Sequence, residues 1–133
     1  MLRLCPGDNM GQRTGLGSLL LLCNRFSDAL SFCQVWLAPD QPPVIPLGGA
    51  TFDPPSSACL DASAEDQLSS YGNGAMAYNA AVAAFKLFGD GDLAQQYLRI
   101  AAKINPFILT KILAKIDKPR KSLKITFGVF FPL

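Results

Sequence analysis

The distribution of proline limits the fold of this chain more than any other feature, because proline interrupts helices and the interior of sheets. Six of the ten prolines lie between residues 39 and 55. The stretches on either side, 9–37 and 74–105, contain none. Both show apolar residues at the spacing of three and four that is typical of amphipathic helices. The sequence therefore predicts two helical regions joined by a long connection.

The first helical region divides into two helices. Asp8 is a suitable N-cap for a helix over residues 9–22, in which leucines recur at helical spacing. Asn24 interrupts this pattern, and a second helix is predicted over 27–37, before Pro39. Because the turn between the two helices is short, we expect them to pack as an antiparallel hairpin.

The second helical region predicts another hairpin. Its first helix is rich in alanine, the best helix former, and places Tyr78, Val82 and Phe85 on one face that we expect to point inward. Asp92 is the expected N-cap of the return helix, in which we expect Leu98 to point inward. The predicted elements are a helix over 75–88, a turn over 89–92, a return helix over 93–104 and a further amphipathic helix over 107–116.

These patterns predict an all-α fold in four parts. The connection is rich in proline, serine and glycine, and it is far longer than the roughly 2–8 residues usual between helices of a bundle. We therefore expect it to be a flexible insertion. The predicted parts are a first hairpin over 1–37, the insertion over 38–73, a second hairpin with a following helix over 74–117, and a basic and apolar tail over 118–133.

The hairpins resemble the tetratricopeptide repeat in the order of their large and small residues. In the second hairpin, Ala94 and Ala101 stand where the two helices of such a repeat cross closely, and Pro106 stands at its end. In the first hairpin Leu16-Gly17 matches, but Trp36 falls where a small residue is expected. The resemblance covers residues 3–37 and 75–118. It implies a stack of helical hairpins, an α-solenoid, that binds another protein on its concave face.

The match extends to a more particular module. The opening Asp8-Asn9-Met10-Gly11-Gln12-Arg13 is similar to the start of a tetratricopeptide-like module in fungal proteins that carry a MYND zinc finger further along. The run over 94–106 and the lysine-rich helix after it resemble the second half of that module. The sequence printed here holds no Cys/His cluster corresponding to such a finger.

Both ends of the sequence read as interrupted repeats. Its first residues resemble the end of a return helix, and its last predicted helix has no return helix, so we expect a fragment of a longer array. Open repeat ends expose apolar side chains and favour self-association. The side chains concerned are Leu16, Leu19 and Leu20 at one end and Ile108, Ile112 and Ile116 at the other.

Catalytic chemistry has little support in the sequence. The chain contains no histidine, so triads of the Ser-His-Asp or Cys-His type are excluded, as are imidazole metal ligands. Its cysteines, Cys5, Cys23, Cys33 and Cys59, form no CxxC pair. No apolar run reaches the roughly 20 residues that span a bilayer. We therefore expect an intracellular protein, cytoplasmic or nuclear, that is not an enzyme and needs no metal, cofactor or membrane.

Candidate residues for partner binding lie on the first helix of each hairpin. They are Gln12, Arg13, Tyr78, Asn79 and Lys86. Two of them have structural alternatives. Arg13 is equally suited to pairing with Asp8 or a neighbouring helix end, and Tyr78 is suited to the core.

The charge distribution gives a second functional hypothesis. Residues 99–124 hold eight basic residues and one acid, a net charge of +7, whereas the rest of the chain carries −5. The face from Lys103 to Lys124 is an alternative site for nucleic acid or another acidic surface. Only Phe107 interleaves with its lysines, which makes nucleic acid the weaker choice. The candidate patch is Lys111, Lys115, Lys118, Arg120 and Lys121. A third alternative is a truncated gene product without independent function.

Overall fold

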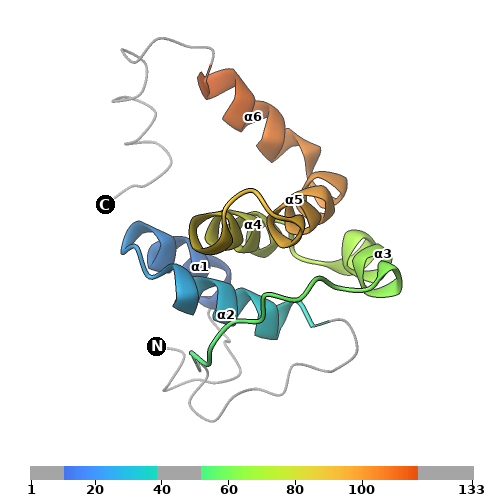
Figure 1. The fold of residues 1–133 in the computed structure, drawn as a ribbon. Coiled ribbons are helices and arrows are strands. Elements are labelled where there is room, and N and C mark those ends of the chain that lie inside the picture. The colour runs from blue at the N-terminus through green and yellow to red at the C-terminus, as the bar shows by residue number, and fades with distance from the viewer. Residues whose placement is uncertain (1–10, 39–51, 117–133) are drawn as a thin grey trace.

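A computed structural model describes residues 11–38 and 52–116 of the chain. Within these ranges the chain forms six α-helices and no strand, which confirms the predicted all-α fold class (Figure 1). The predicted Asp8 cap and the tail over 118–133 lie outside the described residues. The helices are α1 (Arg13–Leu22), α2 (Phe26–Trp36), α3 (Ala62–Tyr71), α4 (Gly74–Phe88), α5 (Asp92–Ile104) and α6 (Pro106–Ile116).

A tight turn joins α1 to α2. Asn24 in this turn has a φ of 57°, a conformation that asparagine adopts more readily than most residues. The backbone amide of Arg25 donates to the carbonyl of Leu20 at 2.9 Å, which satisfies one of the last carbonyls of α1. The Arg25 Nε lies 2.6 Å from Oδ2 of Asp28, in the first turn of α2. The turn reverses the chain, and α2 packs against α1.

The α4–α5 pair is bounded by polar and glycine caps. The Asn73 side chain accepts a hydrogen bond from the Met76 amide at 3.0 Å and caps α4. Gly89 follows α4 with a φ of 79°, which glycine adopts at no steric cost. Gly91 is the residue at the N-cap of α5, and Asp92 is the first helical residue. The expected cap at Asp92 was therefore one residue late, and its carboxylate instead complements the dipole of α5.

The buried face of α4 consists mainly of alanine, which corrects the expected inner face. The expected inner face consisted of Tyr78, Val82 and Phe85. Only Tyr78 is buried, whereas Val82 is 45 % and Phe85 is 52 % exposed. Helix α4 packs against α1, α2 and α5, and small side chains let these helices approach it closely. The side chains of Val82, Phe85, Leu87 and Phe88 lie on its outer side. Its buried residues are Met76, Ala77, Tyr78, Asn79, Ala80, Ala81, Ala83 and Ala84.

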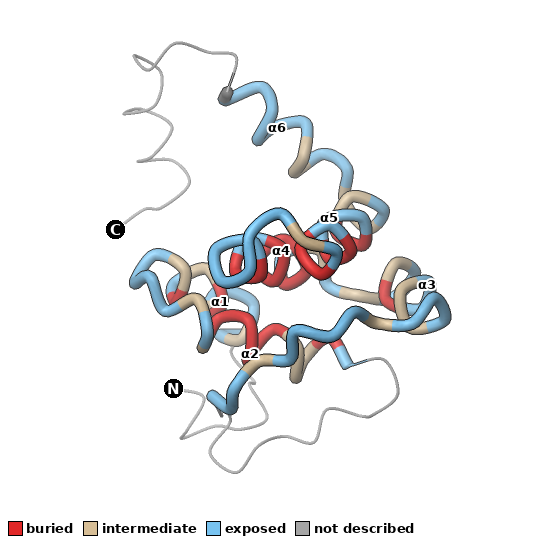
Figure 2. The backbone as a smooth tube through the Cα atoms, viewed as in Figure 1, coloured by how far each residue is buried: buried red, intermediate tan, exposed pale blue. Residues whose placement is uncertain are grey.

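The helices pack in a stack whose core runs through α2, α4 and α5. Helices α1 and α2 both pack against α4, α4 packs against α5, and α6 packs against α5 (Figure 1). Figure 2 shows the buried residues concentrated along α2, α4 and α5, while α6 is exposed along most of its length. The largest fully buried side chains are Phe32, Leu30 and Cys33 from α2 and Tyr97 and Ile100 from α5.

Helix α3 lies inside the segment that the sequence indicated to be a flexible insertion over 38–73. Asp61 caps it by accepting a hydrogen bond from the Ala64 amide at 2.7 Å, and α3 packs against α5. Before it, the Gln34 side chain of α2 makes two hydrogen bonds, of 2.8 and 2.9 Å, with the backbone of Ser56. The expectation of flexibility therefore does not hold for residues 62–71, and residues 39–51 lie outside the described residues.

The side chains expected at open repeat ends differ in exposure. Leu20 is buried and Leu16 is partly buried against the core, whereas Leu19 is 58 % exposed. At the other end Ile108 is partly buried and Ile112 is 45 % exposed. Of the six side chains, only that of Ile116 lies outside the described residues.

Gly17 lies at a close contact between α1 and its neighbours α2 and α4. A Cβ added there lies 2.9 Å from Nδ2 of Asn79 and 3.3 Å from Sγ of Cys33, whereas a Cβ at Gly15 meets no atom within 4 Å. Gly15→Ala is expected to raise the free energy of unfolding by about 0.5–1 kcal/mol through helix propensity. Gly17→Ala is expected to lower it by about 1 kcal/mol, because Asn79 must move. Urea denaturation of the two variants measures these free energies of unfolding. An equal increase in both variants would contradict the close contact at Gly17.

Candidate functional site

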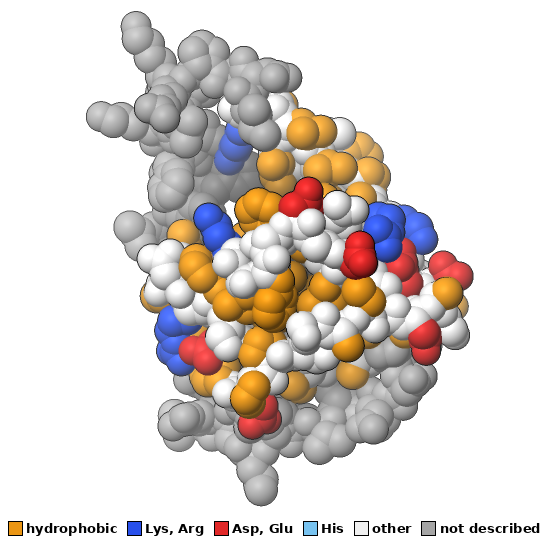
Figure 3. All heavy atoms as spheres, in the orientation of Figure 1, with side chains coloured by type: hydrophobic (Ala, Val, Ile, Leu, Met, Phe, Trp, Pro, Cys, Tyr) orange, Lys and Arg blue, Asp and Glu red, His pale blue; other side chains and the backbone are white. Residues whose placement is uncertain are grey.

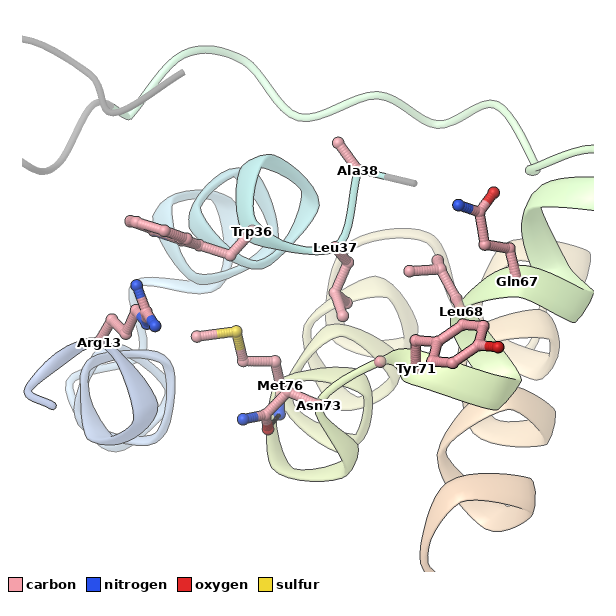
Figure 4. A pocket seen from close by; sticks show the side chains of 10 residues that line it. Arg13, Trp36, Leu37, Ala38, Gln67, Leu68, Tyr71, Asn73 and Met76 are labelled. Atoms are coloured by element: carbon pink, nitrogen blue, oxygen red, sulfur yellow. Dashed lines mark hydrogen bonds between the residues drawn. The ribbon is translucent and has the colours of Figure 1, made fainter. Parts of the chain in front are cut away.

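A cleft of about 330 Å³ opens where α1, the end of α2, the end of α3 and the start of α4 meet (Figure 4). Figure 4 shows Arg13 and Trp36 at one end of this cleft, Tyr71 at the other, and Met76 and Leu68 between them. Its lining residues are Arg13, Trp36, Leu37, Ala38, Gln67, Leu68, Tyr71, Gly72, Asn73 and Met76. Arg13, one of the predicted contact residues, is therefore a lining residue of this cleft.

Closely packed side chains form the Arg13 end of the cleft. The guanidinium carbon of Arg13 lies 4.8 Å from the centroid of the Trp36 ring, within the range of a cation–π interaction. Trp36 also packs on Phe32, with the ring centroids 6.3 Å apart. The indole Nε1 is buried and has no hydrogen-bond acceptor among the described residues. The repeat pattern expects a small residue at position 36. The large Trp36 side chain is accommodated there because it lies between Arg13 and Phe32.

The structure does not bring the five predicted contact residues onto one surface. Gln12 and Lys86 are exposed, whereas Tyr78 and Asn79 are buried. The Tyr78 hydroxyl donates to the carbonyl of Asn105 at 3.0 Å, and Asn79 exchanges hydrogen bonds with Ser18 of α1. Tyr78 and Asn79 therefore join helices to one another, which argues against direct contact with a partner.

The predicted basic face is partly paired within the molecule. The Arg99 Nε lies 3.2 Å from Oε1 of Glu65, and the Lys103 Nζ lies 3.7 Å from Oδ1 of Asp66, so α3 supplies acids to this face. Hydrogen bonds from Arg99 and Gln96 lower the pKa of Glu65 below its usual range. Two residues of the candidate basic patch, Lys111 and Lys115, are exposed on α6. The other three, Lys118, Arg120 and Lys121, lie outside the described residues.

A second hollow, the α4–α5 groove, lies on the outer side of this helix pair and has a volume of about 220 Å³. Its large apolar side chains are those of Val82, Phe85 and Leu98, which are 45, 52 and 42 % exposed. Asp90 and Gln95 stand at its rim, at the end where α4 turns into α5. The groove is lined by Ala81, Val82, Phe85, Asp90, Ala94, Gln95 and Leu98. Leu98, which we expected to point inward, is a groove residue.

Titratable groups of the core are held in their neutral forms. Burial raises the pKa of the Cys33 thiol to about 12, and burial likewise raises the pKa of Tyr97 to about 12. Neither side chain is a nucleophile at neutral pH. Across residues 11–38 and 52–116, no group of three or more His, Cys, Asp or Glu side chains is placed to hold a metal ion. Among the helices formed by these residues, none has the length and apolar character needed to span a bilayer.

The residues that the structure describes form two hollows that could hold a partner, the cleft and the α4–α5 groove. No protein-family model matches the chain, and neither a curated protein nor a solved structure matches it. The choice between the surfaces rests on their chemistry. The wide cleft is bounded by polar and apolar groups alike, whereas the groove presents large, accessible hydrophobic side chains with few polar neighbours.

Proposed function

We propose that this chain is a non-catalytic scaffold that binds another protein in the α4–α5 groove. The observation that carries the proposal is the exposure of Val82, Phe85 and Leu98 side by side on a well-packed helix pair. Contiguous exposed apolar surface is uncommon on soluble proteins and marks interaction sites. Figure 3 shows hydrophobic side chains also gathered over neighbouring α6.

The order of helix packing supports a tetratricopeptide-like scaffold. Two helix pairs, α1–α2 and α4–α5, are stacked through α4, and α6 continues the order on α5. Small residues lie at the contacts between helices, as that repeat requires: Gly17, Ala94 and Ala101 are all buried. Helix α3 departs from the pattern, because a simple repeat has no helix between its hairpins. The relation to the module of fungal MYND proteins rests on the sequence pattern alone.

The chemistry of the side chains fits a binding role inside the cell. The chain has no histidine, and the buried thiol of Cys33 is held protonated. Cys23, Cys33 and Cys59 are free thiols, as is usual for proteins of a reducing compartment. These features favour an intracellular protein that recognises a partner by its shape and apolar surface.

The proposal is tested by retaining partners from an extract of the source cells on the immobilised chain. Leu98→Gln removes a large apolar side chain from the groove, and Leu87→Gln makes the same change at an exposed position of α4 outside it. We expect the proteins retained by the unsubstituted chain to be lost at least about tenfold with Leu98→Gln and kept with Leu87→Gln. Equal retention by both variants would contradict binding in the groove. If the unsubstituted chain retains no protein specifically, the proposed scaffold function is contradicted.

A further inference from the structure

The apolar face of α6 extends beyond the part of the molecule that covers it. Ile108 and Leu109, in the first half of the helix, are partly buried against the core. Ile112 and Leu113 follow them four residues later and therefore lie on the same face of the helix. They are 45 % and 52 % exposed. The second half of α6 thus carries an apolar face that the rest of the described chain leaves open.

The junction between α5 and α6 fixes the direction in which α6 leaves the body. The Tyr78 hydroxyl donates to the carbonyl of Asn105 at 3.0 Å, and the Phe107 amide donates to Oδ1 of Asn105 at 3.2 Å. Pro106, with its restricted φ, is the first residue of α6. Figure 1 shows α6 diverging from the α4–α5 pair. The exposed half of α6 therefore cannot fill the α4–α5 groove of its own chain while the first half keeps its contacts with the core.

The α4–α5 groove and the exposed half of α6 are complementary in chemistry. The large apolar side chains of the groove are about half exposed. Asp90 lines the groove, and among the described residues that line it none is basic. Asp90 already accepts a hydrogen bond from Gln95, but a carboxylate can accept several. On α6 the exposed Lys111 stands directly before Ile112, so this helix offers apolar side chains together with a positive charge.

The two surfaces are placed so that two copies of the chain can exchange them. Figure 1 shows α6 standing over one side of the α4–α5 pair, and Figure 3 shows hydrophobic side chains gathered over both. A two-fold axis brings each surface of one copy against the other surface of its partner, which makes two identical contacts. Opposite charges at the edge of each contact fix its register.

We propose that a second copy of this chain occupies the groove, with the exposed half of each α6 packed in the α4–α5 groove of its partner. Ile112 and Leu113 then cover the apolar floor, and Lys111 lies beside Asp90. The inference rests on the proposed function, because it places a second copy of the chain in the groove assigned to protein partners. Another protein that takes the groove must compete with this dimer.

Sedimentation velocity of the full chain tests the proposal, and we expect a monomer–dimer equilibrium in the micromolar range. Leu113→Asp places a charge on the exposed half of α6, and Leu98→Asp places one in the groove. Each is expected to raise the Kd of the dimer at least about tenfold. The matched Leu87→Asp, on α4 outside the groove, is expected to leave the Kd unchanged. A chain that stays monomeric at every concentration, or equal effects of all three substitutions, would overturn the proposal.

An equimolar mixture of Leu113→Asp and Leu98→Asp distinguishes the reciprocal contact from other dimers. In a dimer of either variant alone, both contacts carry a new charge. In the mixed dimer, one contact carries both charges and the other carries neither. We therefore expect the mixture to associate several-fold more tightly than either variant alone. No gain on mixing would contradict the packing of α6 in the groove of the partner.

A charge reversal at an exposed position keeps the test decisive if Leu98→Asp fails to fold. Lys111→Asp is expected to raise the Kd several-fold because the new carboxylate faces Asp90, and adding Asp90→Lys in the same chain is expected to restore it. An unchanged Kd in folded Lys111→Asp would overturn the proposed register. Monomers that still retain other proteins in the groove would contradict this inference alone. Dimers that retain no other protein would contradict only the proposed scaffold function.

Discussion

Replacing Gln96 with alanine is expected to lower the free energy of unfolding by about 3 kcal/mol, because buried polar groups lose their partners. The Gln96 side chain is 5 % exposed. Its Oε1 accepts a hydrogen bond from the Leu60 amide at 2.7 Å, and its Nε2 donates to the Leu60 carbonyl at 2.8 Å and to Oε2 of Glu65 at 3.0 Å. This one side chain of α5 thus holds both α3 and the chain before it.

The neighbouring residue supplies the control for Gln96→Ala. Gln95 is exposed, and its side chain donates one hydrogen bond, of 3.0 Å, to Oδ1 of Asp90. Gln95→Ala is expected to change the free energy of unfolding by no more than about 0.5 kcal/mol. Urea denaturation measures both variants, and hydrogen exchange should show faster exchange of α3 amides in Gln96→Ala only. Equal midpoints for the two variants would mean that α3 is not held by Gln96.

Replacing Ala101 with leucine is expected to cost about 1–3 kcal/mol of stability through overpacking. Ala101 has no exposed surface, and it lies on the buried side of α5, which packs most extensively against the alanine-lined face of α4. An added isopropyl group has no space there unless the two helices separate. Helix α5 also packs against α3 and α6. A shift of α5 therefore disturbs its contacts with α3, α4 and α6 at once.

The control for Ala101→Leu is the same substitution at Ala75, which is exposed in the first turn of α4. Ala75→Leu is expected to leave the midpoint of thermal unfolding nearly unchanged. Scanning calorimetry compares the two variants. An unchanged midpoint for Ala101→Leu would argue against a close crossing of α4 and α5, and with it against the tetratricopeptide-like assignment.

The sequence predicted five of the six helices in residues 11–38 and 52–116, because each of the five has a strong local pattern and clear boundaries. Proline, glycine and asparagine near the ends of these helices placed most predicted boundaries within one or two residues of the observed ones. The exception is the beginning of α1. Helix α3 was missed because Leu68 is its only buried residue, and polar contacts with α5 hold it. Its local signal was Asp61, an N-cap residue, with the acidic Glu65 in the first turn of the helix. Periodicity cannot show which distant side chains such a helix will meet.

The orientation of α4 could not be predicted from its sequence for a different reason. Apolar residues occur on every side of this helix, so their spacing identifies a helix without identifying its inner face. The alanine side is buried because α1, α2 and α5 all approach α4. The same ambiguity hid the α4 side of the groove, because Val82 and Phe85 had been expected in the core. The candidate contacts Tyr78 and Asn79 proved to be buried for the same reason.

The junction of α1, α2 and α4 contains a natural reporter of its own opening. The thiol of Cys33 is fully buried beneath Gly17, and its pKa of about 12 leaves roughly one molecule in 100,000 as thiolate at pH 7. Cys23 and Cys59 are exposed, so an alkylating reagent can reach them in the folded chain. Labelling of Cys33 must wait until α1 lifts from its neighbours. At a reagent concentration that outpaces reclosing, the labelling rate equals the rate of this opening. The unsubstituted chain therefore reveals, by mass spectrometry alone, how often its first helix detaches.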